Sequence, residues 1–130
     1  MTTGYSGTPL PQKLGIRAGS RVLLDGAPEG FELGVPASTR AVSTYDVALL
    51  FVTDLARLRK RWEVLHGRVT PEGRLWVCWP KRASGVPTDL GDDVVRQHGL
   101  THGRVDVKVC AIDQTWSALA FVVRRADRPS

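Results

Sequence analysis

One stretch decides the fold: Arg74-Leu-Trp-Val-Cys-Trp-Pro-Lys-Arg-Ala-Ser-Gly-Val-Pro-Thr-Asp89, in which an apolar run leads directly into a basic, turn-rich loop. Leu75 to Trp79 is apolar without interruption, and Pro80 ends the run. Such a run is typical of an interior strand of a parallel sheet. We therefore expect a buried strand here, followed by a loop and by a helix that begins at Thr88 or Asp89.

The loop after this strand is the leading candidate for a binding site. In open parallel sheets ligands bind at the carboxyl ends of the strands, and the N-terminus of a helix attracts anions. The loop residues that suit an anion are Lys81, Arg82, Ser84, Gly85 and Thr88. The alternative interpretation is an ordinary strand-to-helix connection whose basic side chains are solvated.

Length and composition predict one globular domain over residues 1–130, with a flexible lead-in at 1–7 and a polar tail at 126–130. The 130 residues are 42% hydrophobic and 24% charged, which is ordinary for a globular chain. No apolar run approaches the ~20 residues of a membrane span. The first residues have no signal-peptide pattern, so the sequence predicts a cytoplasmic protein with no membrane contact. The two cysteines lie in apolar runs, where a free cysteine is a small buried hydrophobe, and no metal site is predicted.

Strand and helix signals alternate along the chain. Strands are expected at Arg21–Asp25 and at Asp46–Thr53, the second of them central. Thr53 or Asp54 begins an amphipathic helix that Gly67 ends. Residues 32–45 leave open whether a brief strand forms there, and Thr8-Pro9 predicts a short helix that ends at Gly15.

The remaining elements follow from turn signals and alternation. Pro71-Glu72-Gly73 is expected to be a turn. A helix is expected at Asp89–Gln97 with Leu90 and Val94 inward, and the strands Arg104–Ile112 and Ser117–Arg125 form a hairpin. This order predicts an α/β, Rossmann-like fold: a mostly parallel five- or six-stranded sheet flanked by helices, ending in an antiparallel hairpin.

Basic residues are scattered along this chain of net charge +5, apart from one block, Arg57 to Arg61. On a helix, Leu58 and Trp62 share an apolar face, whereas Arg57, Lys60 and Arg61 point away from it. We therefore interpret the block as the solvated face of an amphipathic helix. A nucleic-acid-binding patch is the alternative.

Two segments resemble class I S-adenosylmethionine-dependent methyltransferases: the closing hairpin, and Leu14 to Asp25, which looks like their lead-in and first strand. The resemblance implies a truncated Rossmann-like fold. Gly26 to Gly30 keeps only part of the glycine-rich turn of that family, and residues 31–46 are too short for the next crossover. No cofactor is therefore expected, although binding of S-adenosylmethionine is testable.

A closer resemblance covers nearly the whole chain. The segments that carry it are Tyr5 to Leu10, Tyr45 to Val52, Trp79 to Gly85 and Val107 to Asp113. In combination they resemble an actinobacterial family of small proteins designated domain of unknown function 3052. This resemblance implies a compact cytoplasmic domain and assigns no catalytic residue.

Three functions fit these observations. The first is a non-catalytic binding or regulatory module, with an unidentified protein, or a second copy of the chain, as its partner. The second is an anion- or nucleotide-binding protein, or an enzyme, acting at the carboxyl edge of the sheet. There Lys81 and Arg82 would hold the anion, Thr53 would lie nearby, and Asp25 or Glu29 would act as a base. A methyltransferase would be a special case of this second function. The third function is nucleic-acid binding through the basic helix face.

Overall fold

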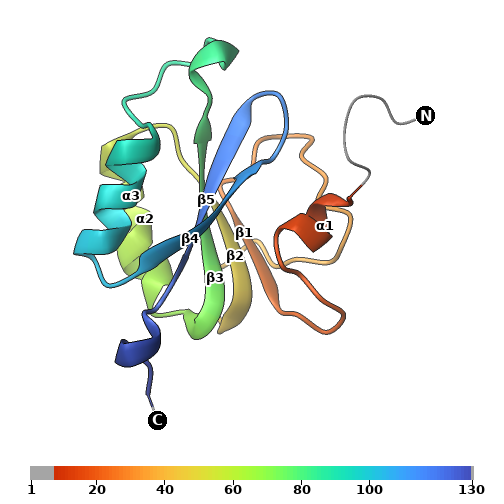
Figure 1. The fold of residues 1–130 in the computed structure, drawn as a ribbon. Helices are drawn as coiled ribbons and strands as arrows, with labels where there is room; N and C mark the ends of the chain where they lie inside the picture. The colour runs from red at the N-terminus through yellow and green to blue at the C-terminus, as the bar shows by residue number, and fades with distance from the viewer. Residues whose placement is uncertain (1–7, 130) are drawn as a thin grey trace.

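A computed structural model describes residues 8–129 and shows a five-stranded open sheet with helices on its faces (Figure 1). The predicted flexible lead-in, residues 1–7, lies outside the described residues. The α-helices and strands are α1 (Leu10–Lys13), β1 (Val22–Asp25), β2 (Tyr45–Phe51), α2 (Leu55–His66), β3 (Val69–Pro80), α3 (Asp92–Thr101), β4 (Val105–Ala111) and β5 (Trp116–Val122). Two 3-10 turns, η1 (Arg82–Ser84) and η2 (Arg125–Asp127), complete the set, so the expected polar tail carries a helical turn.

The sheet is mixed, so the expectation of a mostly parallel sheet is wrong. Its strand order is β1-β2-β3-β5-β4. The pairs β1–β2 and β2–β3 are parallel, whereas β3–β5 and β4–β5 are antiparallel. The closing hairpin is confirmed, but β5 returns between β4 and β3 and gives β3 an antiparallel neighbour. β3 is therefore the central strand, a position that the sequence analysis gave to residues 46–53.

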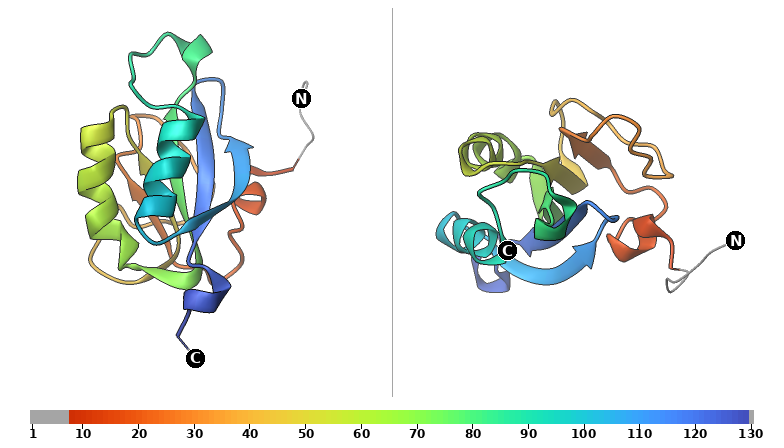
Figure 2. Two further views of the ribbon diagram at one scale, coloured as in Figure 1. Left: turned by 60° about the vertical axis from the view of Figure 1, so that its left-hand side comes forward. Right: turned by 90° about the horizontal axis from the view of Figure 1, so that it is seen from above.

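Both faces of the sheet are covered, by α2 and α3 on one side and by α1 with the segment after β1 on the other (Figures 1 and 2). Leu75 and Val77 of β3 belong to the apolar cluster under α2 and α3. Trp76 and Cys78 belong to the cluster on the α1 side. The indole N–H of Trp76 donates a 3.0 Å hydrogen bond to the carbonyl oxygen of Leu14, which fixes the end of α1 against the sheet.

Pro71 to Gly73 is part of β3 and not the expected turn. The register between β2 and β3 shifts between Tyr45 and Val47, which marks a β-bulge. A Cβ atom at Gly73 would lie 2.5 Å from the carbonyl oxygen of Asp46, so only glycine fits this close approach. Proline and glycine are tolerated in a strand at such irregularities, and here they signal a bulge.

The segment between β1 and β2 has one sheet-like contact. Ser38 forms an isolated parallel bridge with Leu23, and its backbone exchanges hydrogen bonds with Val22 and Leu24. Thr39 to Val42 forms no strand. The bridge covers the outer edge of β1, so β4 provides the open edge of the sheet.

The two long helices differ in how well the sequence predicted them. Asp54 caps α2 by accepting a 2.7 Å hydrogen bond from the backbone N–H of Arg57, as expected. α3 begins at Asp92 instead of Asp89, because the Asp89 carboxylate accepts a hydrogen bond from the backbone N–H of Leu55. As a result Val95 is the buried valine of α3, and Val94, expected inward, is 37% exposed.

None of the helices in residues 8–129 is long and apolar enough to cross a membrane.

Gly99 sets how closely α3 approaches the sheet. A Cβ atom at this position would overlap the ring of Phe121, which is fully buried. Alanine is normally the better helix former by about 1 kcal/mol, but the overlap outweighs that gain. We expect Gly99→Ala to lower the free energy of unfolding by about 1–3 kcal/mol in urea titrations. Leu100→Ala, at an exposed position of the same helix, is the matched control, and equal stability of the two variants would contradict this packing.

Candidate functional site

The carboxyl ends of β2 and β3 meet where the sequence predicted a site, at the top of the sheet in Figure 1. The hydroxyl of Thr88 donates a 2.6 Å hydrogen bond to the carbonyl oxygen of Thr53, which follows β2. The same hydroxyl accepts a 3.0 Å hydrogen bond from the backbone N–H of Leu90. Thr53 and Thr88 are thus brought together, but the Thr88 hydroxyl is engaged in holding the loop.

A groove of about 560 Å³ opens beside this junction, between the loop after β3 and the start of α3. We name it the edge groove. Four of the predicted residues line it together with the first residues of α3: Lys81, Arg82, Gly85, Thr88, Gly91 and Asp92. The loop after β3 is therefore a cavity wall as well as a connection.

Lys81 and Arg82 carry the positive charge of the edge groove. Lys81 is half-buried and Arg82 is exposed, and neither side chain forms an ion pair within the described part of the chain. Gly91, the N-cap of α3, provides no side-chain cap for the backbone N–H groups of the first turn, and Gly91 and Asp92 line this end of the groove. Asp92 in that turn offsets part of the helix dipole. The net result is a cationic groove at a helix N-terminus.

Ser84 and Gly85 shape the loop. The Ser84 hydroxyl donates a 2.6 Å hydrogen bond to the carbonyl oxygen of Lys81 and accepts one from the backbone N–H of Val86. Gly85 ends η1 with a φ of 79°, a left-handed conformation that favours glycine. Ser84, predicted to bind an anion, therefore holds the turn that presents its basic neighbours.

Asp25 does not lie free at the end of β1. Its carboxylate accepts hydrogen bonds from Arg61, through Nε at 3.0 Å and through Nη2, and the two side chains are only 12% and 23% exposed. The prediction that Arg61 points into solvent is wrong, because its guanidinium is held by the Asp25 carboxylate at the end of β1. Glu29, the other candidate base, is exposed in the following turn and does not line the edge groove.

Gly26 follows β1 where a methyltransferase would carry its glycine-rich turn. Its φ is 74°, and a Cβ atom there would lie 2.8 Å from the carbonyl oxygen of Phe51. This glycine therefore serves the close packing of the ends of β1 and β2.

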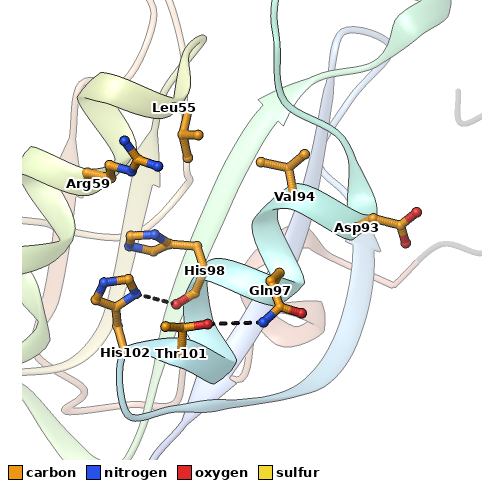
Figure 3. A pocket seen from close by; sticks show the side chains of 8 residues that line it. All are labelled: Leu55, Arg59, Asp93, Val94, Gln97, His98, Thr101 and His102. Atoms are coloured by element: carbon orange, nitrogen blue, oxygen red, sulfur yellow. Dashed lines mark hydrogen bonds between the residues drawn. The ribbon is translucent and has the colours of Figure 1, made fainter.

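A second groove, missed by the sequence analysis, lies between α2 and α3 (Figure 3). It has a volume of about 540 Å³, and we name it the histidine groove. Its lining includes Arg59 of α2 and, beside it on α3, His98 and His102. The sequence signal was the four-residue spacing of these histidines, which puts both on one helix face.

The two histidine rings are packed face to face. Their centroids are 4.0 Å apart with an interplanar angle of 23°. Burial, with smaller contributions from the charges of His102 and Arg59, lowers the pKa of His98 to about 4. His98 is therefore a neutral imidazole at neutral pH, and its Nε2 atom is buried with no hydrogen-bond partner among residues 8–129.

His66, at the end of α2, has a structural role. Its Nδ1 atom accepts a 3.2 Å hydrogen bond from Nε of Arg104. Arg104 also donates to the carbonyl oxygens of His66 and Val69, so it joins the end of α2 to the start of β3. Burial lowers the pKa of Arg104 to about 10, and burial followed by the charge of Arg104 lowers the pKa of His66.

Both cysteines are buried and free, as expected for small core residues. Burial raises the pKa of the Cys78 and Cys110 thiols, which keeps them protonated and unreactive. Within the described ranges, no group of three or more histidine, cysteine, aspartate or glutamate side chains is placed to hold a metal ion.

No protein-family model matches the chain, and no curated protein is significantly similar to it. The geometry of the two grooves is therefore the basis for inferring function.

Asp25, a candidate site residue, stabilises the fold through its ion pair with Arg61. Replacing one member leaves a largely buried charge without its partner. We expect Asp25→Asn to lower the free energy of unfolding by about 1–3 kcal/mol, measured by urea denaturation. Asp93→Asn is the control, because Asp93 is fully exposed at 3.8 Å from Arg96 and such pairs contribute little. A fully stable Asp25→Asn protein would return Asp25 to the list of candidate bases.

Proposed function

We propose that this protein is a small, non-catalytic binding module whose ligand or partner presents an anionic group to the edge groove. One observation carries the proposal. Lys81 and Arg82 reach the groove without carboxylate partners, whereas the potentially catalytic groups beside them are engaged in internal hydrogen bonds. Guanidinium and ammonium groups beside helix N–H groups bind phosphate or carboxylate well.

The absence of catalysis is inferred from how the polar groups are used. A covalent mechanism needs a nucleophile within reach of a base. Ser84 is bonded to the carbonyl oxygen of Lys81, and Asp25 is bonded to Arg61. Asp92, the carboxylate that lines the groove, lies in the first turn of α3, where it stabilises the helix dipole.

The fold supports a methyltransferase-like origin without a cofactor. The closing hairpin, with β5 antiparallel between β3 and β4, agrees with the resemblance to the end of class I S-adenosylmethionine-dependent methyltransferases. Gly26 packs against the end of β2, which favours a degenerate cofactor loop. The resemblance to domain of unknown function 3052 includes Trp79 to Gly85, a segment that forms part of the lining of the edge groove.

Two predictions are untested: that a second copy of the chain is a partner, and that the protein is cytoplasmic. β4 is the open edge strand, and its Val107 and Val109 are more than half exposed. Lys108 and a bulge between Asp106 and Lys108 oppose pairing along this edge. Nucleic-acid binding through α2 is weakened because Arg61, counted in the basic face, is paired with Asp25.

The anion site is tested by a thermal-shift screen with inorganic phosphate, pyrophosphate, nucleotides and S-adenosylmethionine. A ligand at a hundred times its Kd stabilises the fold by about 2.7 kcal/mol. We expect phosphate-bearing compounds to raise the Tm of the wild-type protein, and the double variant Lys81→Ala/Arg82→Ala to lose the shift. Lys60→Ala removes an exposed charge from α2 and should keep it.

Two results would contradict the proposal. An undiminished shift in the double variant would place the anion elsewhere. Chemical conversion of a bound compound, followed by NMR of the recovered ligand, would show that the protein is an enzyme.

A further inference from the structure

We propose that the contact between α2 and α3 is an acid-sensitive switch, which holds the two helices together while His66 and His98 are neutral and weakens when they gain protons. We name this contact the histidine seam: His66 of α2 with His98 and His102 of α3. The switch does not depend on the edge groove, because the groove is lined by the N-terminal end of α3 and the histidines lie near its C-terminal end.

His98 is enclosed by other rings and has no partner for a charge. Its side chain is 7% exposed. The ring of Trp62 meets it edge-on with centroids 5.2 Å apart, and the ring of His102 is stacked on it at 4.0 Å. Its Nε2 atom is buried without a hydrogen-bond partner in residues 8–129. Both nitrogens of an imidazolium carry hydrogen, so a charged His98 would bury an N–H donor that lacks an acceptor.

Arg104 requires the neutral form of His66. A guanidinium only donates hydrogen bonds, so the Nδ1 atom of His66, 3.2 Å from Nε of Arg104, carries a lone pair. Protonation of Nδ1 would remove this acceptor and leave two cations side by side. The end of α2 and the turn after α3 are also in close contact here, since a Cβ atom at Gly103 would lie 3.3 Å from Cε1 of His66.

Two arginines surround the three imidazoles with positive charge. Arg59 of α2 lines the groove beside His98 and His102 (Figure 3). Arg104 follows α3, is 2% exposed and donates to His66. A proton on any ring of the seam is therefore repelled by a fixed cation and by the other rings once they are charged.

Carboxylates of the neighbouring elements do not offset this charge. Glu63 of α2 is exposed, Asp93 of α3 lies 3.8 Å from Arg96, and Asp106 of β4 is hydrogen-bonded to Arg96. β5 meets the seam with the apolar ring of Phe121, which packs on Trp62. Among the described residues, no carboxylate forms an ion pair with a histidine of the seam.

The lowered pKa values of His66 and His98 give the direction of the pH dependence. Burial, followed by the charges of His102 and Arg59, lowers the pKa of His98 from 6.5 to about 4. Burial, followed by the charges of Arg104 and His102, lowers the pKa of His66. Below pH 6.5 the unfolded chain therefore binds more protons than the folded chain. The stability contributed by the neutral rings is complete above pH 6.5 and is lost as the pH falls toward 4.

The first experiment is urea denaturation of the full chain at several pH values between 7 and 4.5. Each proton that the fold excludes raises the unfolding equilibrium constant by up to tenfold per pH unit. His98→Phe keeps an aromatic ring in the stack and removes the titrating group, so the rise should become severalfold smaller per pH unit. Gln97→Ala, in the same groove, should keep the wild-type dependence. Because the slopes are compared, a variant of lower stability is still informative.

The second experiment uses the wild-type protein and does not depend on a variant that folds. NMR titration of the histidine ring protons should show His98 neutral at pH 5 in the folded protein. His66→Gln keeps an acceptor for Arg104 and cannot be protonated, so it should also reduce the pH dependence of unfolding.

Three results would overturn the proposal. The first is a folded protein in which the ring of His98 titrates near pH 6.5. The second is a wild-type unfolding equilibrium constant that does not change between pH 7 and 5. The third is a His98→Phe protein with the wild-type pH dependence.

Discussion

Burial of β3 on both faces is the constraint on which the rest of the structure depends. Leu75 to Cys78 are inaccessible to solvent. A strand without a solvated face needs a hydrogen-bonding strand at each edge and an apolar layer on each side. β2 and β5 form hydrogen bonds with the two edges of β3. α2 and α3 form one apolar layer, and α1 with the segment after β1 forms the other. The one polar atom of the buried Trp76 side chain is also satisfied, because its indole N–H donates a hydrogen bond to the carbonyl oxygen of Leu14.

The sequence predicted the elements whose signals are local. The apolar runs at Leu75–Trp79 and Asp46–Thr53 identify strands, and the Asp54 cap identifies the start of α2. The sequence did not predict the partner of β3, since hydrophobic periodicity shows that a strand is buried but not which strand lies beside it. A strand that is paired in parallel on one edge and antiparallel on the other has the same apolar sequence pattern as a strand in a fully parallel sheet.

The errors about the site share a physical cause, which is that polar side chains found partners far away in the sequence. Asp25 and Arg61 are 36 residues apart, and Asp89 bonds to Leu55 across 34 residues. An aspartate that caps its own helix and one that bonds to a neighbouring helix have the same local sequence, so the start of α3 was placed too early. The His98–His102 spacing, in contrast, is a local signal, because residues four apart lie on one face of a helix.

α3 contributes to both grooves with different chemistry at its two ends. Its N-terminus lies beside Lys81 and Arg82, which suits an anion, whereas its last turns present the stacked rings of His98 and His102. At about 1.5 Å per residue, the ten residues of α3 separate these ends by roughly 15 Å. Substitutions that far apart, with no shared partners, act additively. Loss of anion binding on replacing Lys81 would therefore leave the packing of the histidine pair intact.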